Sequence, residues 1–158
     1  MSPDSAPSSF IQGPFAPGMM MRTPRRTITD GDFSAIVNVT WESGPLHTDD
    51  VYMRDSPFRQ RILGGPCLIA MAAGLTSATM YASWDAAGLD CHAALGIDEI
   101  RYVAPVFTND TIHVEIVVLE LRPTPGGSGL VGVVGDTVRK QDDRIVMTMK
   151  RSYLLKSK

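Results

Sequence analysis

The sequence predicts an α+β domain in which an antiparallel β-sheet wraps around one long, apolar α-helix. Two observations carry this prediction. Residues 62–84 contain no charged side chain, as expected for a helix buried in a domain core. After Gly88 the chain changes to Val- and Ile-rich segments separated by turn residues, the pattern of consecutive antiparallel strands. A sheet with one apolar face can bury such a helix by curving around it.

Composition narrows the class of protein. The chain has 158 residues, of which 44% are hydrophobic and 20% charged, and its net charge is −2. These values predict one globular domain with no nucleic-acid partner. Its two cysteines, Cys67 and Cys91, have neither a disulfide framework nor the spacing of a zinc site, which fits a reducing cytoplasm. We expect residues 1–14 to be a mobile tail and residues 15–158 to form the domain.

The uncharged segment is also long enough to cross a membrane. It opens with Gly64-Gly65-Pro66, contains further Gly, Ser and Thr residues, and is the only such segment among soluble-type strands. We therefore predict a buried helix and no membrane partner. Pro66 suits the first turn of this helix, because a missing N–H is tolerated there. The helix should end near Trp84, with Gly88 beyond it.

The remaining elements follow from caps and periodicity. Residues 22–28 are predicted to be an early strand or an extended lead-in. Thr29 or Asp30 can cap a helix that runs to about Thr40, and a shorter helix should end at Arg54. The predicted strands cover 92–102, 111–121, 130–138 and 145–155.

His47 is the histidine best placed for chemistry. It lies with Glu42 in an irregular link between two predicted helices, where catalytic groups tend to occur. A carboxylate and an imidazole facing one water can pass protons in both directions near neutral pH. Spacing alone leaves a surface Glu and a loop His as the alternative. His92 and His113 belong to no motif, and His113 is expected to point away from the core.

The start of the long helix is a second candidate site. Its first N–H groups lack partners within the helix and carry the positive end of the helix dipole. Gly65 would allow a ligand to approach the backbone closely. A thioester carbonyl bound there would be polarised, and an enolate forming on it would be stabilised. The alternative is a tight turn before a buried helix.

Several short motifs carry a resemblance to a known family. They are Arg26-Thr27-Ile28-Thr29, Pro45-Leu46-His47-Thr48-Asp49, Pro57-Phe58, Arg61-Ile62 with Gly65, Ala104-Pro105-Val106-Phe107 and Asp110-Thr111. In their order and spacing, residues 22–155 resemble the MaoC-like dehydratase family, which includes R-specific enoyl-CoA hydratases.

The resemblance implies a hot-dog fold and a homodimer, or a larger homo-oligomer, in which two sheets join edge to edge beside the active site. In the family, an Asp and a His activate water for reversible addition to a trans-2-enoyl thioester, and a glycine amide binds the thioester oxygen. Carried over, the His is His47 and the glycine is Gly65. The implied partner is an acyl-CoA or acyl-carrier thioester. Coenzyme A is part of the substrate, and no metal or other cofactor is implied.

Four positions depart from the family pattern. Glu42 stands where the family has its catalytic Asp, and Gly44 stands where it usually has Asn. Gly64 replaces a common His before the oxyanion glycine. Pro66 follows Gly65 directly, so the next backbone N–H is absent. The extra methylene of Glu42 matters, because a misplacement of about 1 Å can lower a rate on the order of a hundredfold.

Three functions remain open from the sequence. The leading one is an acyl-thioester hydro-lyase with Glu42, His47 and Gly65 as catalytic residues. The alternatives are a non-catalytic acyl-CoA-binding subunit of a hetero-oligomeric dehydratase and a hot-dog thioesterase. The predicted substrate-binding residues are the helix-start residues Gly64 and Pro66 and two arginines that could meet phosphates, Arg59 and Arg61.

Overall fold

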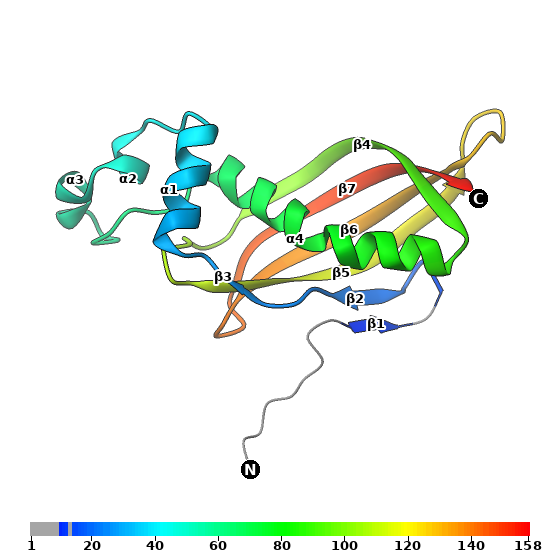
Figure 1. Ribbon diagram of the computed structural model, residues 1–158, viewed down its shortest axis with the longest axis horizontal. Coiled ribbons are helices and arrows are strands. Elements are labelled where there is room, and N and C mark those ends of the chain that lie inside the picture. The colour runs from blue at the N-terminus through cyan, green and yellow to red at the C-terminus, as the bar shows by residue number, and fades with distance from the viewer. Residues whose placement is uncertain (1–9, 13) are drawn as a thin grey trace, which may run out of the picture.

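The computed structural model describes residues 10–12 and 14–158 as one layer of sheet with one long helix packed across it (Figure 1). The helices are α1 Asp30–Val39, α2 Pro45–Thr48, α3 Asp50–Arg54 and α4 Gly65–Ala86. The strands are β1 Phe10–Gln12, β2 Met20–Arg22, β3 Arg26–Thr27, β4 Leu89–Tyr102, β5 Thr111–Pro123, β6 Leu130–Lys140 and β7 Ile145–Ser157.

The sheet has the order β1-β2-β5-β6-β7-β4, with β3 also paired to β5, and every pairing is antiparallel. The four long strands match the four predicted ones, each extended by a few residues. The predicted arrangement, an antiparallel sheet wrapped around a central helix, is confirmed. Helices α1 to α3 gather beyond the end of the sheet at which α4 begins (Figure 1).

Helix α4 has one face buried against the sheet and one face exposed. Its buried residues recur at helical spacing: Cys67, Leu68, Ala72, Thr76, Thr79, Met80, Ser83 and Trp84. By length and composition alone α4 could cross a membrane, a test that core helices also pass. Pro66 lies in its first turn as predicted, and Gly88, with φ of +67°, follows its end.

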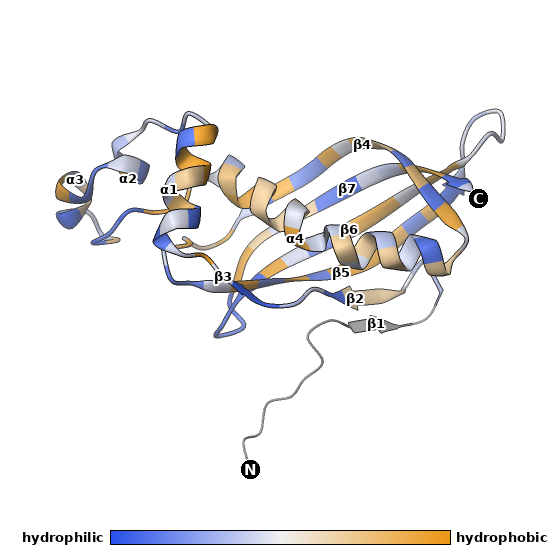
Figure 2. Ribbon diagram, in the orientation of Figure 1, coloured by the Kyte–Doolittle hydropathy of each residue, from blue (hydrophilic) through white to orange (hydrophobic). Residues whose placement is uncertain are grey.

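The helix-facing side of the sheet forms the core. On β5, Ile112, Val114 and Ile116 are buried on this side, and polar and apolar positions alternate along the strands (Figure 2). His113 lies between two of these residues and was expected to point away from the core. It is nevertheless completely buried, so another part of the molecule covers the sheet at this position. Alternation predicts the face on which a side chain lies, but not whether another segment covers that face.

The N-terminal region completes the sheet. The segment 22–28 contains the end of β2 and all of β3, so it is part strand and part connection. Of the predicted tail, residues 1–9 and 13 lie outside the described residues, while β1 pairs with β2 in antiparallel register. Thr29 caps α1 through a capping box with Asp32, as the sequence indicated.

Candidate functional site

The candidate site is built around residues 62–65, which lead from the turn after α3 into α4. Two backbone hydrogen bonds anchor this segment on both sides. The Ile62 N–H donates to the Leu46 carbonyl (3.1 Å), and the Leu63 N–H donates to the Val106 carbonyl (2.8 Å). Because the segment is fixed in this way, side chains that pack on it are held relative to the start of α4.

The C-terminal end of α1 positions Glu42. The Glu42 N–H donates to the Val37 carbonyl (3.1 Å) and the Trp41 N–H to the Asn38 carbonyl (3.3 Å). This is a Schellman motif, in which the residue after the cap adopts a left-handed conformation. Trp41 is that residue, with φ of +57°. The reversal of direction turns the half-buried Glu42 toward the start of α4.

Glu42 packs directly on Gly64. A Cβ atom at position 64 would lie 3.0 Å from Cγ and 3.1 Å from Cδ of Glu42, and closer still to its Oε2. The Glu42 carboxylate therefore occupies space that a side chain at position 64 would need. Two departures from the family pattern thus fit each other, because the longer Glu side chain lies where the usual His would begin.

His47 reaches the same segment from α2. Its Nδ1 lies 2.7 Å from the Ile62 carbonyl oxygen. A carbonyl can only accept, so Nδ1 carries the proton of this hydrogen bond. In a neutral imidazole, Nε2 then has a free lone pair and can accept a proton. Pro45 in the first turn of α2, preceded by Gly44 as its cap, starts the short helix that carries His47.

Sequence reasoning did not identify a third side chain at the site, Tyr102. It is the last residue of β4, and its ring packs on Gly65. A Cβ atom at position 65 would lie 2.7 Å from the Tyr102 hydroxyl and 2.9 Å from its Cε2. Burial, and then the negative charge of Glu42, raise the pKa of Tyr102. No local signal marks this residue, because its contact depends on how β4 packs beside α4.

The structure brings the predicted catalytic and helix-start residues together. Glu42, His47 and Tyr102 each contact a different residue of the segment 62–65. Glu42 and His47 come from neighbouring parts of the chain, after α1 and in α2, whereas Tyr102 comes from the distant strand β4. A carboxylate, an imidazole and a phenol around a helix start can move protons and stabilise a negatively charged oxygen.

The two predicted phosphate-binding arginines have different surroundings. Arg61 forms ion pairs with Asp50 (2.8 Å) and Asp30 (3.4 Å), and its guanidinium stacks over the Phe33 ring. It therefore links α1 to α3. Arg59 is exposed in the turn after α3, where its Nη1 donates to the Arg54 carbonyl (3.0 Å).

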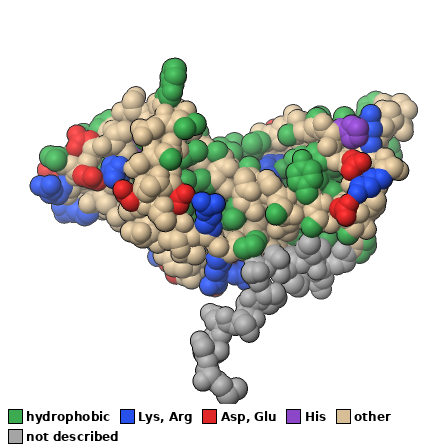
Figure 3. Space-filling view, in the orientation of Figure 1, with side chains coloured by type: hydrophobic (Ala, Val, Ile, Leu, Met, Phe, Trp, Pro, Cys, Tyr) green, Lys and Arg blue, Asp and Glu red, His purple; other side chains and the backbone are tan. Residues whose placement is uncertain are grey.

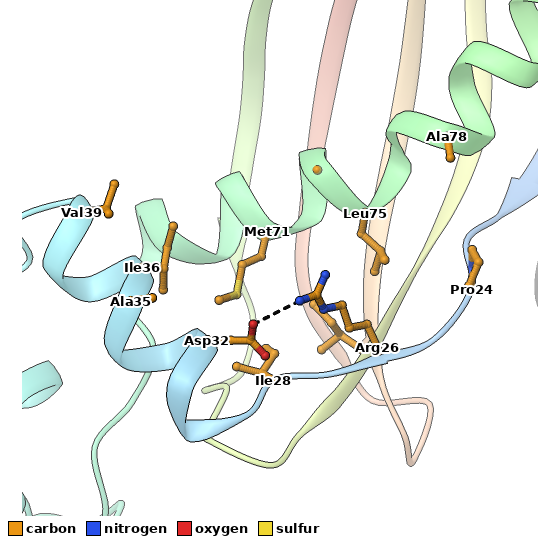
Figure 4. A pocket seen from close by; sticks show the side chains of 12 residues that line it. Pro24, Arg26, Ile28, Asp32, Ala35, Ile36, Val39, Met71, Leu75 and Ala78 are labelled. Atoms are coloured by element: carbon orange, nitrogen blue, oxygen red, sulfur yellow. Dashed lines mark hydrogen bonds and ion pairs between the residues drawn. The ribbon is translucent and has the colours of Figure 1, made fainter.

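A cavity of about 580 Å³ lies between α1, α4 and the chain around β3, and its lining does not include Glu42, His47 or Tyr102 (Figure 4). Its lining is mostly apolar and includes Met71 and Leu75 of α4, while the Arg26–Asp32 ion pair crosses it. Leu68 belongs to the core, and Met80 lines a second cavity of about 370 Å³ between α4 and β4.

The arrangement of potential metal ligands is the next feature of the structure. Within residues 10–12 and 14–158, no group of three His, Cys, Asp or Glu side chains is arranged to hold a metal ion. Cys67 is buried, with its Sγ 3.1 Å from the Thr40 hydroxyl. Apolar side chains are spread over the face of the molecule that displays α4 (Figure 3).

Comparison with known proteins identifies the family and the fold. The family model described as MaoC like domain matches residues 14–138. Protein MaoC of Klebsiella aerogenes is 36% identical over 103 residues, which make up 63% of this chain and 28% of that protein. The chain therefore matches less than a third of the length of this relative.

Two solved structures are similar over nearly their whole length. A monoamine oxidase regulatory protein from Archaeoglobus fulgidus has a TM-score of 0.79 at 25% identity, covering 89% of this chain and 90% of that one. The R-hydratase PhaJ1 from Pseudomonas aeruginosa has a TM-score of 0.67 at 21% identity, covering 96% of this chain and 90% of that one. The hot-dog fold implied by the sequence resemblance is confirmed.

Proposed function

The chain belongs to the MaoC-like domain family, and from this membership and the site geometry we propose that it is an acyl-thioester hydro-lyase. It adds water across the C2–C3 double bond of a 2-enoyl-CoA, and in reverse it dehydrates a 3-hydroxyacyl-CoA. The observation that carries the proposal is the convergence of Glu42 and His47 on the segment that leads into Gly65.

His47 is suited to exchange a proton with water. Its hydrogen bond to the Ile62 carbonyl fixes the ring and leaves Nε2 as the proton acceptor. As the water oxygen bonds to C3, one of its protons passes to a base of the site. C2 then takes up a proton, which an acid of the site supplies. An imidazole and a carboxylate together can fill both roles.

Glu42 is the second proton carrier in this proposal. Its carboxylate lies against Gly64, and the absence of a side chain there accommodates the additional methylene relative to Asp. Because Glu42 and Gly64 fit each other, we infer that Glu42 is a functional replacement for the family's Asp. A carboxylate so close to the helix start is also near the place where the thioester would bind.

Gly65 and Arg59 complete the proposed substrate contacts. The Gly65 N–H belongs to the first turn of α4, where N–H groups lack partners within the helix. A thioester oxygen that accepts from it would gain from the helix dipole as negative charge develops. Arg59 is the better candidate for a coenzyme A phosphate, because Arg61 already pairs with two carboxylates.

The test is hydration of a panel of trans-2-enoyl-CoA esters, followed by loss of enone absorbance. His47→Ala and Glu42→Gln should each lower kcat by about 10²- to 10⁴-fold, the usual contribution of a general acid or base. The matched controls are His92→Ala and Glu120→Gln, which change an exposed histidine and an exposed glutamate on the sheet. These controls should keep wild-type rates.

The same experiment separates the alternatives. Release of free coenzyme A from a saturated acyl-CoA, without hydration, would replace the hydro-lyase by a thioesterase. Binding of acyl-CoA with neither reaction would instead indicate a non-catalytic subunit that needs a partner. Equal hydration rates in the wild type and both site variants would overturn the assigned roles.

We further propose that the protein acts as a cytoplasmic homodimer joined through β4. Within the described residues, β4 pairs with β7 on one edge and has no partner on the other. Leu95 and Ile97 on this strand are 53% and 43% exposed. An exposed apolar edge favours pairing with another strand. Light scattering should give a dimer mass, and Leu95→Glu should shift it toward the monomer.

A further inference from the structure

A developing oxyanion is best stabilised by preorganised donors about 2.7–3.1 Å from its position. At the start of α4 the backbone offers fewer donors than a helix usually does. Gly65 has an N–H, but the next residue, Pro66, has none. The following N–H belongs to Cys67, a completely buried residue one step further into the helix.

Tyr102 places a hydroxyl beside the one remaining outer amide. Its ring lies over Gly65, and the hydroxyl would be 2.7 Å from a Cβ at that position. A side chain at position 65 would collide with the phenol, so the Tyr102 ring can pack here only because residue 65 is glycine. Tyr102 is 53% exposed in the single chain, so the residue is not enclosed in the core.

The protonation state of Tyr102 suits a donor. Burial, with the nearby negative charge of Glu42, raises its pKa above the ordinary value of 10.0. The phenol therefore keeps its proton across the pH range in which an imidazole and a carboxylate exchange theirs. The same Glu42 charge disfavours a phenolate at this place, so Tyr102 donates and does not act as a base.

We propose that the Tyr102 hydroxyl and the Gly65 N–H together bind the thioester oxygen of the substrate, with Tyr102 supplying the donor that Pro66 removes. As water adds to C3, the electrons of the C2–C3 bond shift toward the thioester oxygen, and they return when C2 takes a proton. Tyr102 stabilises the charge in between and keeps its own proton throughout. This inference rests on the proposed hydro-lyase function.

The decisive variant is Tyr102→Phe, which keeps the ring on Gly65 and removes only the hydroxyl. With the best enoyl-CoA of the panel, kcat should fall on the order of a hundredfold while KM changes by a few-fold, the signature of a lost oxyanion donor. The control is Tyr81→Phe, which removes an exposed hydroxyl from α4 and should leave both constants unchanged.

A spectroscopic measurement detects the hydrogen bond from Tyr102 to the thioester oxygen without requiring turnover. The probe is 4-(dimethylamino)cinnamoyl-CoA, whose absorbance moves to longer wavelength when its carbonyl is polarised. The wild type should shift the band on binding, and Tyr102→Phe should shift it less. If wild type hydrates enoyl-CoA but Tyr102→Phe matches it in kcat and in band shift, the inference fails and the hydro-lyase remains.

Three other outcomes would also test the Tyr102 contact or the proposed function. A Tyr102-dependent band shift in a protein that hydrates no ester would overturn the proposed function while supporting the oxygen contact. No band shift in the wild type would overturn the contact. A faster Tyr102→Phe would show that the hydroxyl obstructs the site, which also overturns the inference. Circular dichroism of the variant, expected to match wild type, excludes a folding defect.

Discussion

The two halves of α4 meet polar side chains in opposite ways. Beside its C-terminal half, Arg151 and Asp136 form an ion pair of 2.6 Å and are 5% and 1% exposed. At its N-terminal end, Glu42 and His47 are half-buried and Tyr102 is half-exposed. The first group is sealed between helix and sheet, whereas the second is open at the end of the sheet.

This difference indicates different uses of charge in one fold. Both partners of a buried ion pair must be present, because either one alone would leave an uncompensated charge in an apolar core. Groups at an open helix end lose less hydration, so they remain free to bind a ligand and exchange protons. We expect changes beside the C-terminal half of α4 to alter stability, and changes at its N-terminal end to alter rate.

The largest expected effect is on stability, from Arg151→Met. The variant leaves the Asp136 carboxylate buried without its partner, which should lower the free energy of unfolding by about 3–5 kcal/mol. Urea denaturation followed by fluorescence measures this loss. The double variant Asp136→Leu, Arg151→Met should recover most of it, because no charge remains buried. Unchanged stability with lost activity would contradict the comparison.

The next effect is on rate, from Gly64→Ala. A Cβ at position 64 would push the Glu42 carboxylate aside. Because a shift of about 1 Å can cost on the order of a hundredfold, kcat should fall by about that factor while stability stays nearly constant. Glu42→Asp should also slow the enzyme by withdrawing the carboxylate. Steady-state kinetics on the enoyl-CoA panel measures both.

A double-mutant cycle sharpens this prediction. In Gly64→Ala with Glu42→Asp, the shorter side chain no longer meets the new methyl group, so the double variant should be faster than the product of the single losses predicts. Gly74→Ala is the control on the same helix, since a Cβ there meets nothing within 4 Å. Strictly additive losses would show that Glu42 and Gly64 are not matched.

A smaller effect concerns pH and His113, which is completely buried on β5. Burial, followed by the positive charge of Arg22, lowers the pKa of His113 below its ordinary value of 6.5. The unfolded chain therefore binds a proton that the folded chain does not, and stability falls as the pH drops below about 6.5. His113→Leu should flatten this decline in Tm between pH 7 and 5, whereas His92→Ala should not. An acid decline of the same slope in His113→Leu would assign it to other groups.

Particular residues show what the sequence could predict. The limits of α4 and the long strands follow from Pro66, Gly88 and the alternating Val and Ile positions, because these signals act over a few residues. The roles predicted for Glu42, His47 and Gly65 came from the family resemblance, since their spacing alone leaves a surface Glu and a loop His as the alternative. Tyr102 was not, because its contact with Gly65 depends on how a strand packs against a helix start. The burial of His113 was missed because the alternation of a strand does not show which other segments cover a face.

The smallest expected effect tests the backbone at the open end of α4. Trp41 is left-handed, with φ of +57°, and 88% exposed. A non-glycine residue in this conformation destabilises the folded state by about 1–2 kcal/mol. Glycine removes that strain, but its more flexible unfolded chain offsets about 0.4–1 kcal/mol of the gain. Trp41→Gly should therefore stabilise the fold by up to about 1 kcal/mol in thermal denaturation. Glu42 follows directly and keeps its hydrogen bond to Val37, so kcat should change by less than a few-fold.

Destabilisation that grows with protein concentration would instead show that a second subunit covers the indole, which would place this end of the molecule in the dimer contact as well.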